Sequence, residues 1–273
     1  MTNSVNTNPG ALTALASMRG INTRLDTNAK MLQTGYRIAD AYDDASVFAI
    51  AQGVRSNIKA HASVQSSLNQ GLGLVDVTLA AMRDISNLIG EMRSTLMKAS
   101  DGSLSTPQRD IYKNDALAIH NRILLATNAA DYNGKNQTIV GATNVTFVAD
   151  VSGNTITVGT YGINPAWNNL GTAINAITDA ATGTAAYNLI NPLEQSLNAT
   201  TAVFAATRRQ IVQQISFNED LIEATKKGLG ALVDADVAQV MATQQSLLAQ
   251  RELATNSLSI ANSRPQTLLT LIR

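Results

Sequence analysis

The side chains that could do acid–base, nucleophilic or metal chemistry are few in this chain. It has two histidines, His61 and His120, and no cysteine. Both histidines fall on predicted helices, away from any HExxH, GxSxG or P-loop spacing. Without a thiol there can be no disulfide, thiolate metal site or cysteine nucleophile. The sequence therefore predicts no enzyme active site and no cofactor, and it favours surface or interface roles for both histidines.

Two polar groupings could hold a ligand, and each also has a purely structural interpretation. The adjacent carboxylates Asp43 and Asp44 could bind a cation, although such pairs in turns more often accept local backbone N–H groups or pair with arginine. Arg208–Arg209 and Lys226–Lys227 could form a basic patch, but acidic residues nearby on the same predicted helix favour a salt-bridged face. Asn-x-Thr sequons, a weak signal in a chain rich in Asn and Thr, are present at Asn136, Asn144 and Asn198.

The composition indicates a thin helical protein rather than a wide globular core. The 273 residues are 45% apolar but only 4% aromatic and 15% charged, where a soluble domain has about 25% charged residues. The 20 basic residues balance 20 acidic ones, so no net field attracts nucleic acid or an anionic membrane. No apolar run approaches the roughly 18 residues of a membrane span, and the N-terminus lacks a secretory signal pattern. If the protein leaves the cell, the sequence predicts a different export route.

Apolar residues repeat at alternating spacings of three and four through most of the chain, which predicts long amphipathic helices. The clearest series runs from Leu68 to Leu96 and indicates one helix over 57–98. In the N-terminal helix, Pro9 suits the first turn and Gly35 suits a left-handed C-cap. The predicted long helices cover residues 8–33, 57–98, 107–128, 184–228 and 234–271.

Two stretches break this helical period. Residues 36–56 contain an Asp-Asp pair and Gly53, and they predict an ordered but irregular connector with at most a short helix. Two β-branched runs, NVTFVAD and NTITVGTY, flank Val151–Gly153 and predict a β-hairpin. An isolated hairpin is marginal in water, so this one must lie against the helices or gain a third strand at 138–140. A short amphipathic helix follows around Leu170.

The order of these elements predicts an all-α-dominated fold. We expect helices 57–98, 107–128 and 184–228 to pack as a long coiled-coil rod, with a small β-hairpin region at its tip. The two terminal helices then have few neighbours within one molecule, and lone helices of this length are marginal without a partner. Their wide apolar stripes and sparse charge indicate burial against other chains. The sequence therefore predicts polymerisation through the termini.

Separate blocks at the two ends of the chain resemble a known family. They are SVNTNPGALTAL (4–15), LQTGYRIADAYDDASVFAIA (32–51) and the closing stretch 232–273, which ends SRPQTLLTLIR. Together with ADYNGK (130–135), these blocks resemble bacterial flagellin, the subunit of the flagellar filament. The terminal blocks make up more than a quarter of the chain, whereas residues 136–183 resemble the family in nothing beyond a hairpin.

The resemblance implies a division into domains. Residues 1–35 and 234–273 would form an inner domain of paired terminal helices, and residues 36–56 and 229–233 the connectors. Residues 57–135 and 184–228 would form the helical rod domain. Residues 136–183 would be a short insert in place of a sizeable outer domain, which makes a minimal subunit. Head-to-tail copies would build an open helical tube, as expected of a contact that does not close.

The resemblance also implies partners and a location. The chain would polymerise with itself, and sibling flagellins could share the filament. It would leave the cell unfolded through the flagellar type III export apparatus, with an export chaperone holding its C-terminal segment beforehand. It would meet cap and junction proteins in an extracellular filament.

Residue by residue, the resemblance and the apolar series of the first helix assign the following positions. Subunit-interface positions on the inner helices are Leu12, Leu15, Leu25, Leu32, Leu247, Leu258, Asn262, Leu268, Leu271 and Arg273. Connector positions, where filament contacts concentrate in the family, are Gly35, Arg37, Asp43, Asp44, Asp234 and Asp236. At the site that an animal innate-immune receptor reads in flagellins, a Gln-Arg pair is replaced by Gly90 and Glu91. Arg93 is retained, but the charge reversal beside it means that the sequence does not predict recognition.

Two other functions stay open on the sequence alone. A hook–filament junction protein has the same terminal helices, but the fuller flagellin-like C-terminal block argues against that function. A flagellin-like cell-surface protein could instead hold a glycan with the hairpin, and deletion of residues 136–183 would then abolish binding while filaments still form. The first hypothesis is a structural, non-enzymatic filament subunit for swimming motility.

Overall fold

The computed structural model describes residues 7–162 and 165–271, and these residues are mostly helical. The chain divides into two compact units. The terminal unit comprises residues 1–58 and 224–273, and the central unit comprises residues 59–223. Helix α2 (Ala45–Ala99) and helix α6 (Ile190–Val233) contribute residues to both units.

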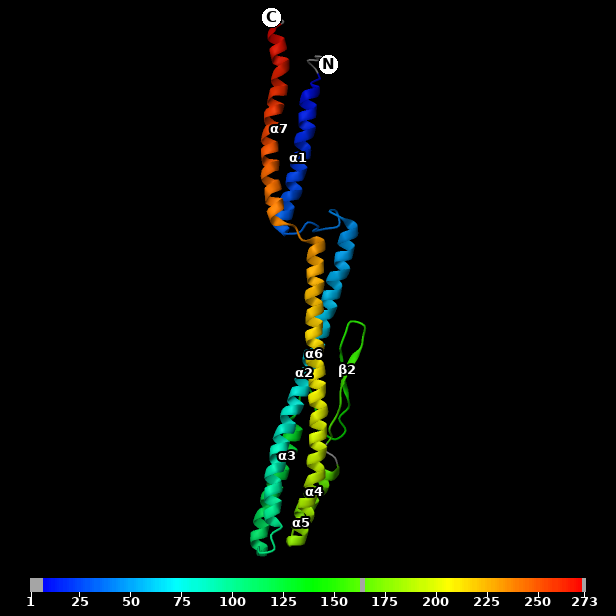
Figure 1. Ribbon diagram of the computed structural model, residues 1–273, viewed down its shortest axis with the longest axis vertical. Coiled ribbons are helices and arrows are strands. Elements are labelled where there is room, and N and C mark those ends of the chain that lie inside the picture. Colours follow the sequence, from blue (N-terminus) through cyan, green and yellow to red (C-terminus); the bar gives the residue numbers. More distant parts are fainter. Residues whose placement is uncertain (1–6, 163–164, 272–273) are drawn as a thin grey trace. The chain divides into compact units, whose positions relative to one another are not determined.

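Two antiparallel helices make up most of the terminal unit. Helix α1 (Pro9–Thr34) and helix α7 (Val237–Leu271) lie side by side (Figure 1). The side chain of Asn8 caps the start of α1 by accepting the Ala11 N–H, and Pro9 occupies the first turn. Helix α1 ends at Gly35, whose φ of 73° lies in the left-handed region that glycine adopts without strain. Pro9 and Gly35 therefore have the roles that the sequence predicted.

Helix α2 begins earlier, and α6 ends later, than the sequence predicted. The expected connector extended to residue 56, yet α2 starts at Ala45, where Asp44 accepts the N–H groups of Ser46 and Val47 at 3.0 Å. The sequence also predicted that α6 would stop near Gly228 or Gly230, but it runs to Val233. The physical reason is a small apolar cluster that both extensions complete; its members are Ile38, Val47, Phe48, Ala51, Leu229, Leu232 and Val233.

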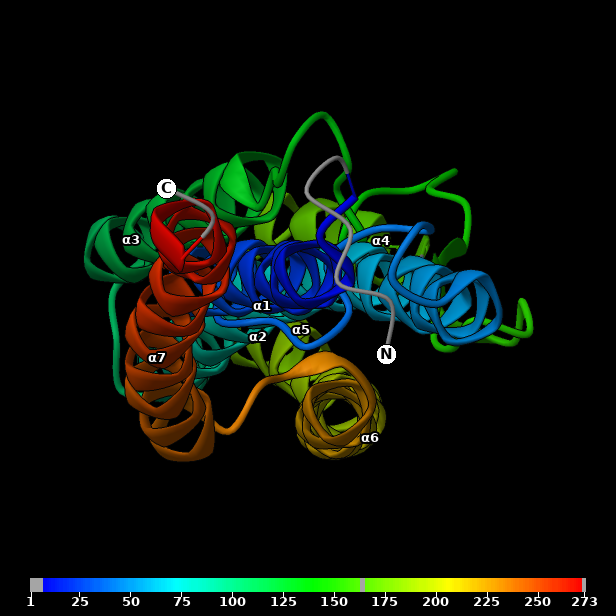
Figure 2. The same cartoon turned by 90° about the horizontal axis from the view of Figure 1, so that it is seen from above.

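Helices α6 and α7 are separate elements, although only a short segment lies between them. Figure 2 shows the break after the end of α6, where residues 234–236 lead into α7. Asp236 accepts the Gln239 N–H at 3.1 Å and so satisfies one of the free donors in the first turn of α7.

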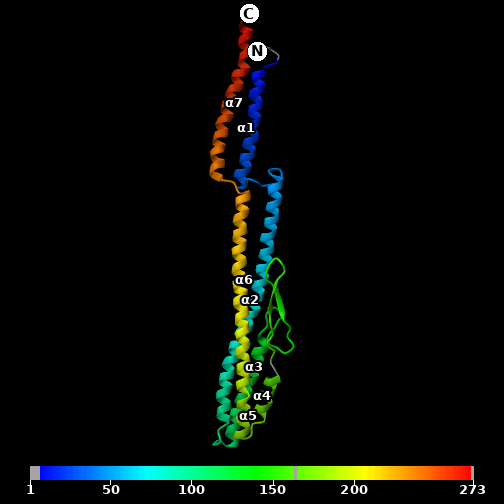
Figure 3. The same cartoon turned by 45° about the vertical axis from the view of Figure 1, so that its right-hand side comes forward.

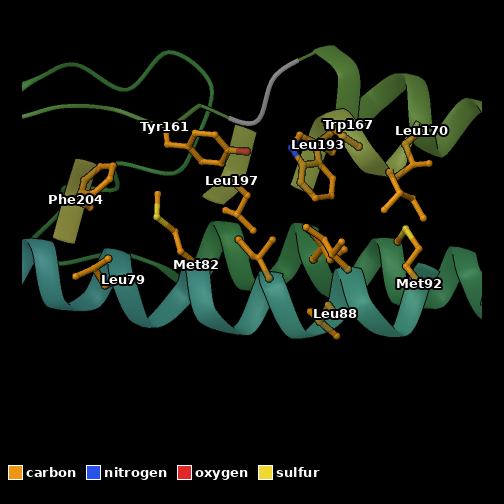
Figure 4. Close-up of a cluster of buried hydrophobic side chains, with 14 of the residues drawn as sticks. Leu79, Met82, Leu88, Met92, Tyr161, Trp167, Leu170, Leu193, Leu197 and Phe204 are labelled. Atoms are coloured by element: carbon orange, nitrogen blue, oxygen red, sulfur yellow. The ribbon is translucent and has the colours of Figure 1, made fainter. Parts of the chain in front are cut away.

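The central unit is a helical bundle with one continuous apolar core. Helix α3 (Thr106–Ala129) begins at a Ser105–Gln108 capping box. Helices α4 (Pro165–Asn175) and α5 (Ala180–Asn188) complete the unit, and α5 takes up the start of the helix predicted over 184–228. Figure 4 shows buried side chains of α2, α4 and α6, together with Tyr161 from the segment that precedes α4. The labelled ones are Leu79, Met82, Leu88, Met92, Tyr161, Trp167, Leu170, Leu193, Leu197 and Phe204.

The predicted hairpin is present, but the prediction that it lies at the tip of the helices is wrong. Strands β1 (Val145–Val148) and β2 (Thr155–Val158) pair antiparallel, with Val145 opposite Val158. The hairpin lies alongside α2 and α6 (Figures 1 and 3). The Val148 N–H donates to Ser67 Oγ at 3.1 Å, and the Phe147 ring occupies the space that a Cβ on Gly71 would fill. Within the described residues the sheet has two strands and no third. Packing against the helices stabilises the hairpin in place of a third strand.

The predicted fold class, all-α-dominated with one small β-hairpin, is confirmed. Among the helices of the described residues, none combines the length and the apolar character needed to cross a membrane.

Candidate functional site

Helices α1 and α7 bury only a narrow seam between them. On α1 the positions that face α7 include Met18, Leu25 and Leu32, at intervals of seven residues. Of these, Leu25 is 7% exposed. On α7 the positions that face α1 include Val240 and Leu247, which are 9% and 4% exposed. Asn28 Nδ2 donates to the Val240 carbonyl at 2.9 Å, so the one buried polar side chain of α1 is satisfied. The pair therefore covers one face of each helix.

The faces turned away from this seam keep large apolar side chains in solvent. Leu12 on α1 is 58% exposed, and Leu253 and Ile260 on α7 are 66% and 61% exposed. Near the end of the pair, Leu12 and Leu15 line a shallow groove together with Leu258 and Asn262. An antiparallel pair of this kind offers no third helix to cover those faces, and monomers rarely keep such surfaces open.

The expected interface residues thus fall into three groups. Leu25, Leu32 and Leu247 face the seam within the chain, where they hold the pair together. Leu12, Leu15, Leu258 and Asn262 border the open groove. The side chains of Leu268 and Leu271 lie outside the described part of the structure, and Arg273 lies outside the described residues. Leu253 and Ile260 are not among the predicted interface positions, although their seven-residue spacing on the side of α7 away from the seam was an available signal.

The two connectors hold each other at the end of α6. The Ala235 N–H donates to the Gly35 carbonyl at 2.9 Å, and Tyr36 forms an antiparallel bridge with Asp234. The backbone N–H of Arg37 donates to the Val233 carbonyl at 2.7 Å, and its guanidinium donates to the Leu232 carbonyl at 2.6 Å. These bonds satisfy carbonyl groups at the C-terminus of α6, where a cation is also favourable for the helix dipole.

An ion-pair cluster orders the first connector. Lys30 Nζ lies 2.7 Å from both Asp40 Oδ2 and Asp43 Oδ1. The same Asp43 carboxylate accepts the N–H groups of Ala39 and Asp40 at 2.9 and 3.1 Å. The hydrogen bond from Lys30 is the main cause that lowers the pKa of Asp40 and of Asp43, and the two carboxylates raise the pKa of Lys30. Asp43 therefore pairs with a lysine and accepts backbone N–H groups, and Asp44 accepts backbone N–H groups. These are the contacts expected of carboxylates that stabilise a turn rather than bind a cation.

Gly90, Glu91 and Arg93, which the resemblance relates to a receptor-binding site, lie on α2 in the central unit. Glu91 Oε2 pairs with Arg122 of α3 at 3.1 Å. Arg93 forms an ion pair with Glu194 and donates to Asn191 Oδ1 at 2.8 Å, both on α6. Gly90 is exposed, and a Cβ there would meet open space. The charged groups at this site are therefore already paired across helices.

Both histidines join helices of the central unit. Asn218 of α6 donates from Nδ2 to the His61 carbonyl at 2.9 Å, and its Oδ1 lies 2.7 Å from His61 Nδ1. Since that amide oxygen can only accept, Nδ1 carries the proton in this pair. His120 of α3 lies 3.2 Å from the Trp167 carbonyl, and its ring fills the space over Gly171 on α4. These contacts fit packing roles.

Comparisons with known proteins point in one direction. Residues 5–137 match the sequence model of the bacterial flagellin N-terminal helical region. The chain is 32% identical to flagellin FljK of Caulobacter vibrioides over 99% of both chains. It is also 32% identical to a flagellin of Brucella melitensis, again over 99% of both chains. A solved structure of a putative flagellar hook-associated protein from Vibrio parahaemolyticus superposes with a TM-score of 0.63 at 13% identity, covering 70% of this chain and 100% of that one. That last likeness is one of fold.

Proposed function

The chain belongs to the bacterial flagellin family, and we propose that its filament assembles through the helix pair α1–α7. As a flagellin it is a structural subunit of the extracellular flagellar filament, a polymer of copies of itself. The observation that carries the proposal is the exposure of Leu12, Leu253 and Ile260 on a helix pair that buries only one seam. Removing one such side chain from water contributes about 1.5–3 kcal/mol, so packing of copies stabilises both the pair and the polymer.

In this proposal residues 1–35 and 234–273 form the inner domain. The connectors fix the orientation in which the α1–α7 pair meets neighbouring copies. Residues 57–135 and 184–228 form the rod domain, with residues 136–183 as a short insert. Arg37 and the Lys30 cluster hold the connectors in one geometry, which favours identical contacts in every copy. A helical polymer needs such repetition because each subunit offers and receives the same surfaces.

Substitution of Leu253 by Asp tests the proposal. The side chain is open in the single subunit, so the change should leave the fold intact, but it would place an unpaired carboxylate in a contact between copies. We expect purified Leu253→Asp subunits to form no filaments in electron micrographs while their helical circular dichroism matches the wild type. Asn121→Asp, at an exposed position of α3 in the central unit, adds the same charge outside the helix pair and should still assemble. Normal filaments from Leu253→Asp would contradict the proposal.

In the cell, the filament would serve swimming motility, with export of the unfolded chain through the flagellar type III apparatus. The support is family membership. A strain that lacks its own flagellins and expresses this chain should swim in soft agar, whereas the same strain with Leu253→Asp should export subunits into the medium and not swim. Subunits retained inside the cell in both cases would count against the export route.

A narrower proposal concerns the innate-immune receptor. Gly90 and Glu91 stand where the family carries a Gln-Arg pair, and Glu91 is tied to Arg122, so we propose that this flagellin is a poor ligand. The double substitution Gly90→Gln with Glu91→Arg should raise signalling in receptor-expressing reporter cells above the wild-type level. Equal signalling from both proteins would contradict the proposal.

A further inference from the structure

The sulfur chemistry of this chain lies entirely in thioethers, because it has seven methionines and no cysteine. Their environments differ sharply. In the central unit Met82 and Met92 are each 1% exposed. Met18 and Met31 on α1 are half-buried. Met97 on α2 and Met241 on α7 are 58% and 55% exposed, so within the described residues these two meet a dissolved oxidant first.

The two exposed methionines lie in opposite surroundings. Met241 stands four residues after Val237 and seven before Leu248, which places all three on one stripe of α7. Val237 and Leu248 are 43% and 41% exposed, so this outer stripe (Val237, Met241, Leu248) is apolar and open in the single subunit. Met97 has polar residues three and four positions away on its helix, and the neighbouring Lys98 lies over the Tyr112 ring.

We propose that Met241 is an oxidation site that controls assembly, and that its co-reactant is a hydroperoxide such as hydrogen peroxide. With hydrogen peroxide, the sulfur lone pair attacks one peroxide oxygen, an S–O bond forms and the O–O bond breaks. The proton on the transferred oxygen passes to the departing hydroxide, which leaves as water. Sulfur loses two electrons and the peroxide gains them. The product sulfoxide is polar and chiral, and it sits in the middle of an apolar stripe.

The effect on assembly rests on the proposed function of the α1–α7 pair. A sulfoxide oxygen buried against an apolar partner surface without a hydrogen bond is unfavourable. Oxidised subunits should therefore need about tenfold more protein to reach the same extent of assembly, as expected for one unsatisfied polar group. Once copies are packed, the same contact should shield the Met241 sulfur from solvent.

Peroxide treatment of the full-length subunit, followed by peptide mass spectrometry and light scattering, tests this proposal. We expect the mass of one added oxygen on the Met97 and Met241 peptides well before the Met82 and Met92 peptides, and a rise in the subunit concentration needed for assembly. Met241→Leu should assemble normally before and after treatment. Met97→Leu is the matched control and should remain as sensitive as the wild type. The peptide containing Met1, which lies outside the described residues, is followed separately.

Two results would overturn the proposal. One is normal assembly of wild-type subunits whose Met241 is fully oxidised, and the other is oxidation of Met241 in preformed filaments as fast as in free subunits. Either result can occur while Leu253→Asp still blocks filaments, so failure of this inference is distinguishable from failure of the proposed assembly surface. If Leu253→Asp assembles normally, the assembly surface itself is wrong.

Discussion

At the scale of single residues, the Lys30 cluster makes the first connector sensitive to pH. A carboxylate whose pKa is lowered by folding contributes stability that is complete above its unfolded value, near 3.8, and is lost as the pH falls through the folded pKa. For Lys30, whose pKa is raised, the contribution is present below its ordinary value of 10.5 and is lost above the folded pKa. The connector should therefore be ordered at neutral pH and loosen in strong acid and in strong base.

Amide chemical shifts of Ala39 and Asp40, both donors to Asp43, report this titration. In acid we expect them to move toward random-coil values as Asp43 is protonated. Asp43→Asn should abolish the transition, whereas Asp26→Asn, on the same helix as Lys30 but outside the cluster, should preserve it. A transition that persists in Asp43→Asn would show that another group is responsible. Because these side chains are partly exposed to solvent, the change should stay local.

Two glycines on α2 should respond in opposite ways to alanine. At Gly73 an added Cβ would lie 2.6 Å from the Tyr132 hydroxyl oxygen, so the ring must shift at a cost of about 1–3 kcal/mol. At Gly90 nothing lies within 4 Å, so alanine should stabilise the helix by about 0.5–1 kcal/mol. Urea unfolding followed by circular dichroism measures both changes. Equal shifts for the two variants would contradict the contact at Gly73.

These glycines also show what the sequence could not reveal. The spacing of apolar residues predicts α2 correctly through Gly71 and Gly73, because one glycine only weakens a long amphipathic pattern. It does not show that Phe147 and Tyr132, each far away in sequence, occupy the spaces that the two glycines leave open. Tyr132 belongs to ADYNGK, where Asn133 and Gly134 both have positive φ. The stretch was recognisable, but its docking partner was not.

At the scale of elements, the sequence predicted types better than boundaries. Gly53, Gly228 and Gly230 suggested helix ends, yet α2 and α6 run through them because the apolar cluster around Val233 outweighs the local preference for a break. The spacing of apolar residues within one helix does not show which residues of other segments pack against it, so this cluster could not be predicted. The hairpin was misplaced for the same reason, since its two strands were evident but the helix faces that receive them were not.

The insert should prove inseparable from the central core. Trp167 is 1% exposed, and Ile174 and Ile177 are fully buried, although all three lie within 136–183. Deletion of that stretch should abolish cooperative thermal unfolding of the central unit, measured by calorimetry, so it cannot serve as a clean test of glycan binding. Trp167→Ala alone should cost about 3–5 kcal/mol. A milder change at the exposed turn, Val151→Ser, should leave the melting temperature unchanged.

At the scale of the whole molecule, the two units should differ in stability. The core of the central unit gathers side chains from α2, α3, α4, α5, α6 and the hairpin, whereas α1 and α7 share one seam. Local opening needs the least free energy where few apolar contacts must break, and an isolated pair of helices is marginal. We therefore expect amides of α1 and α7 to exchange quickly in free subunits and slowly in filaments.

Hydrogen exchange with mass spectrometry on both forms checks this expectation, with α3 as an internal reference that should be protected in each. The comparison discriminates between two ways of making a polymer. If the α1–α7 pair becomes ordered only when copies pack, the contacts between copies must offset the conformational entropy that the pair loses. Leu253→Asp subunits should then keep fast exchange in α1 and α7 at any concentration. If α1 and α7 are already strongly protected in free subunits, their exposed leucines are stable in water without a partner, and the seam within one chain suffices. In that case copies add contacts to a preformed pair, and the expectation that the pair becomes ordered only on assembly is wrong.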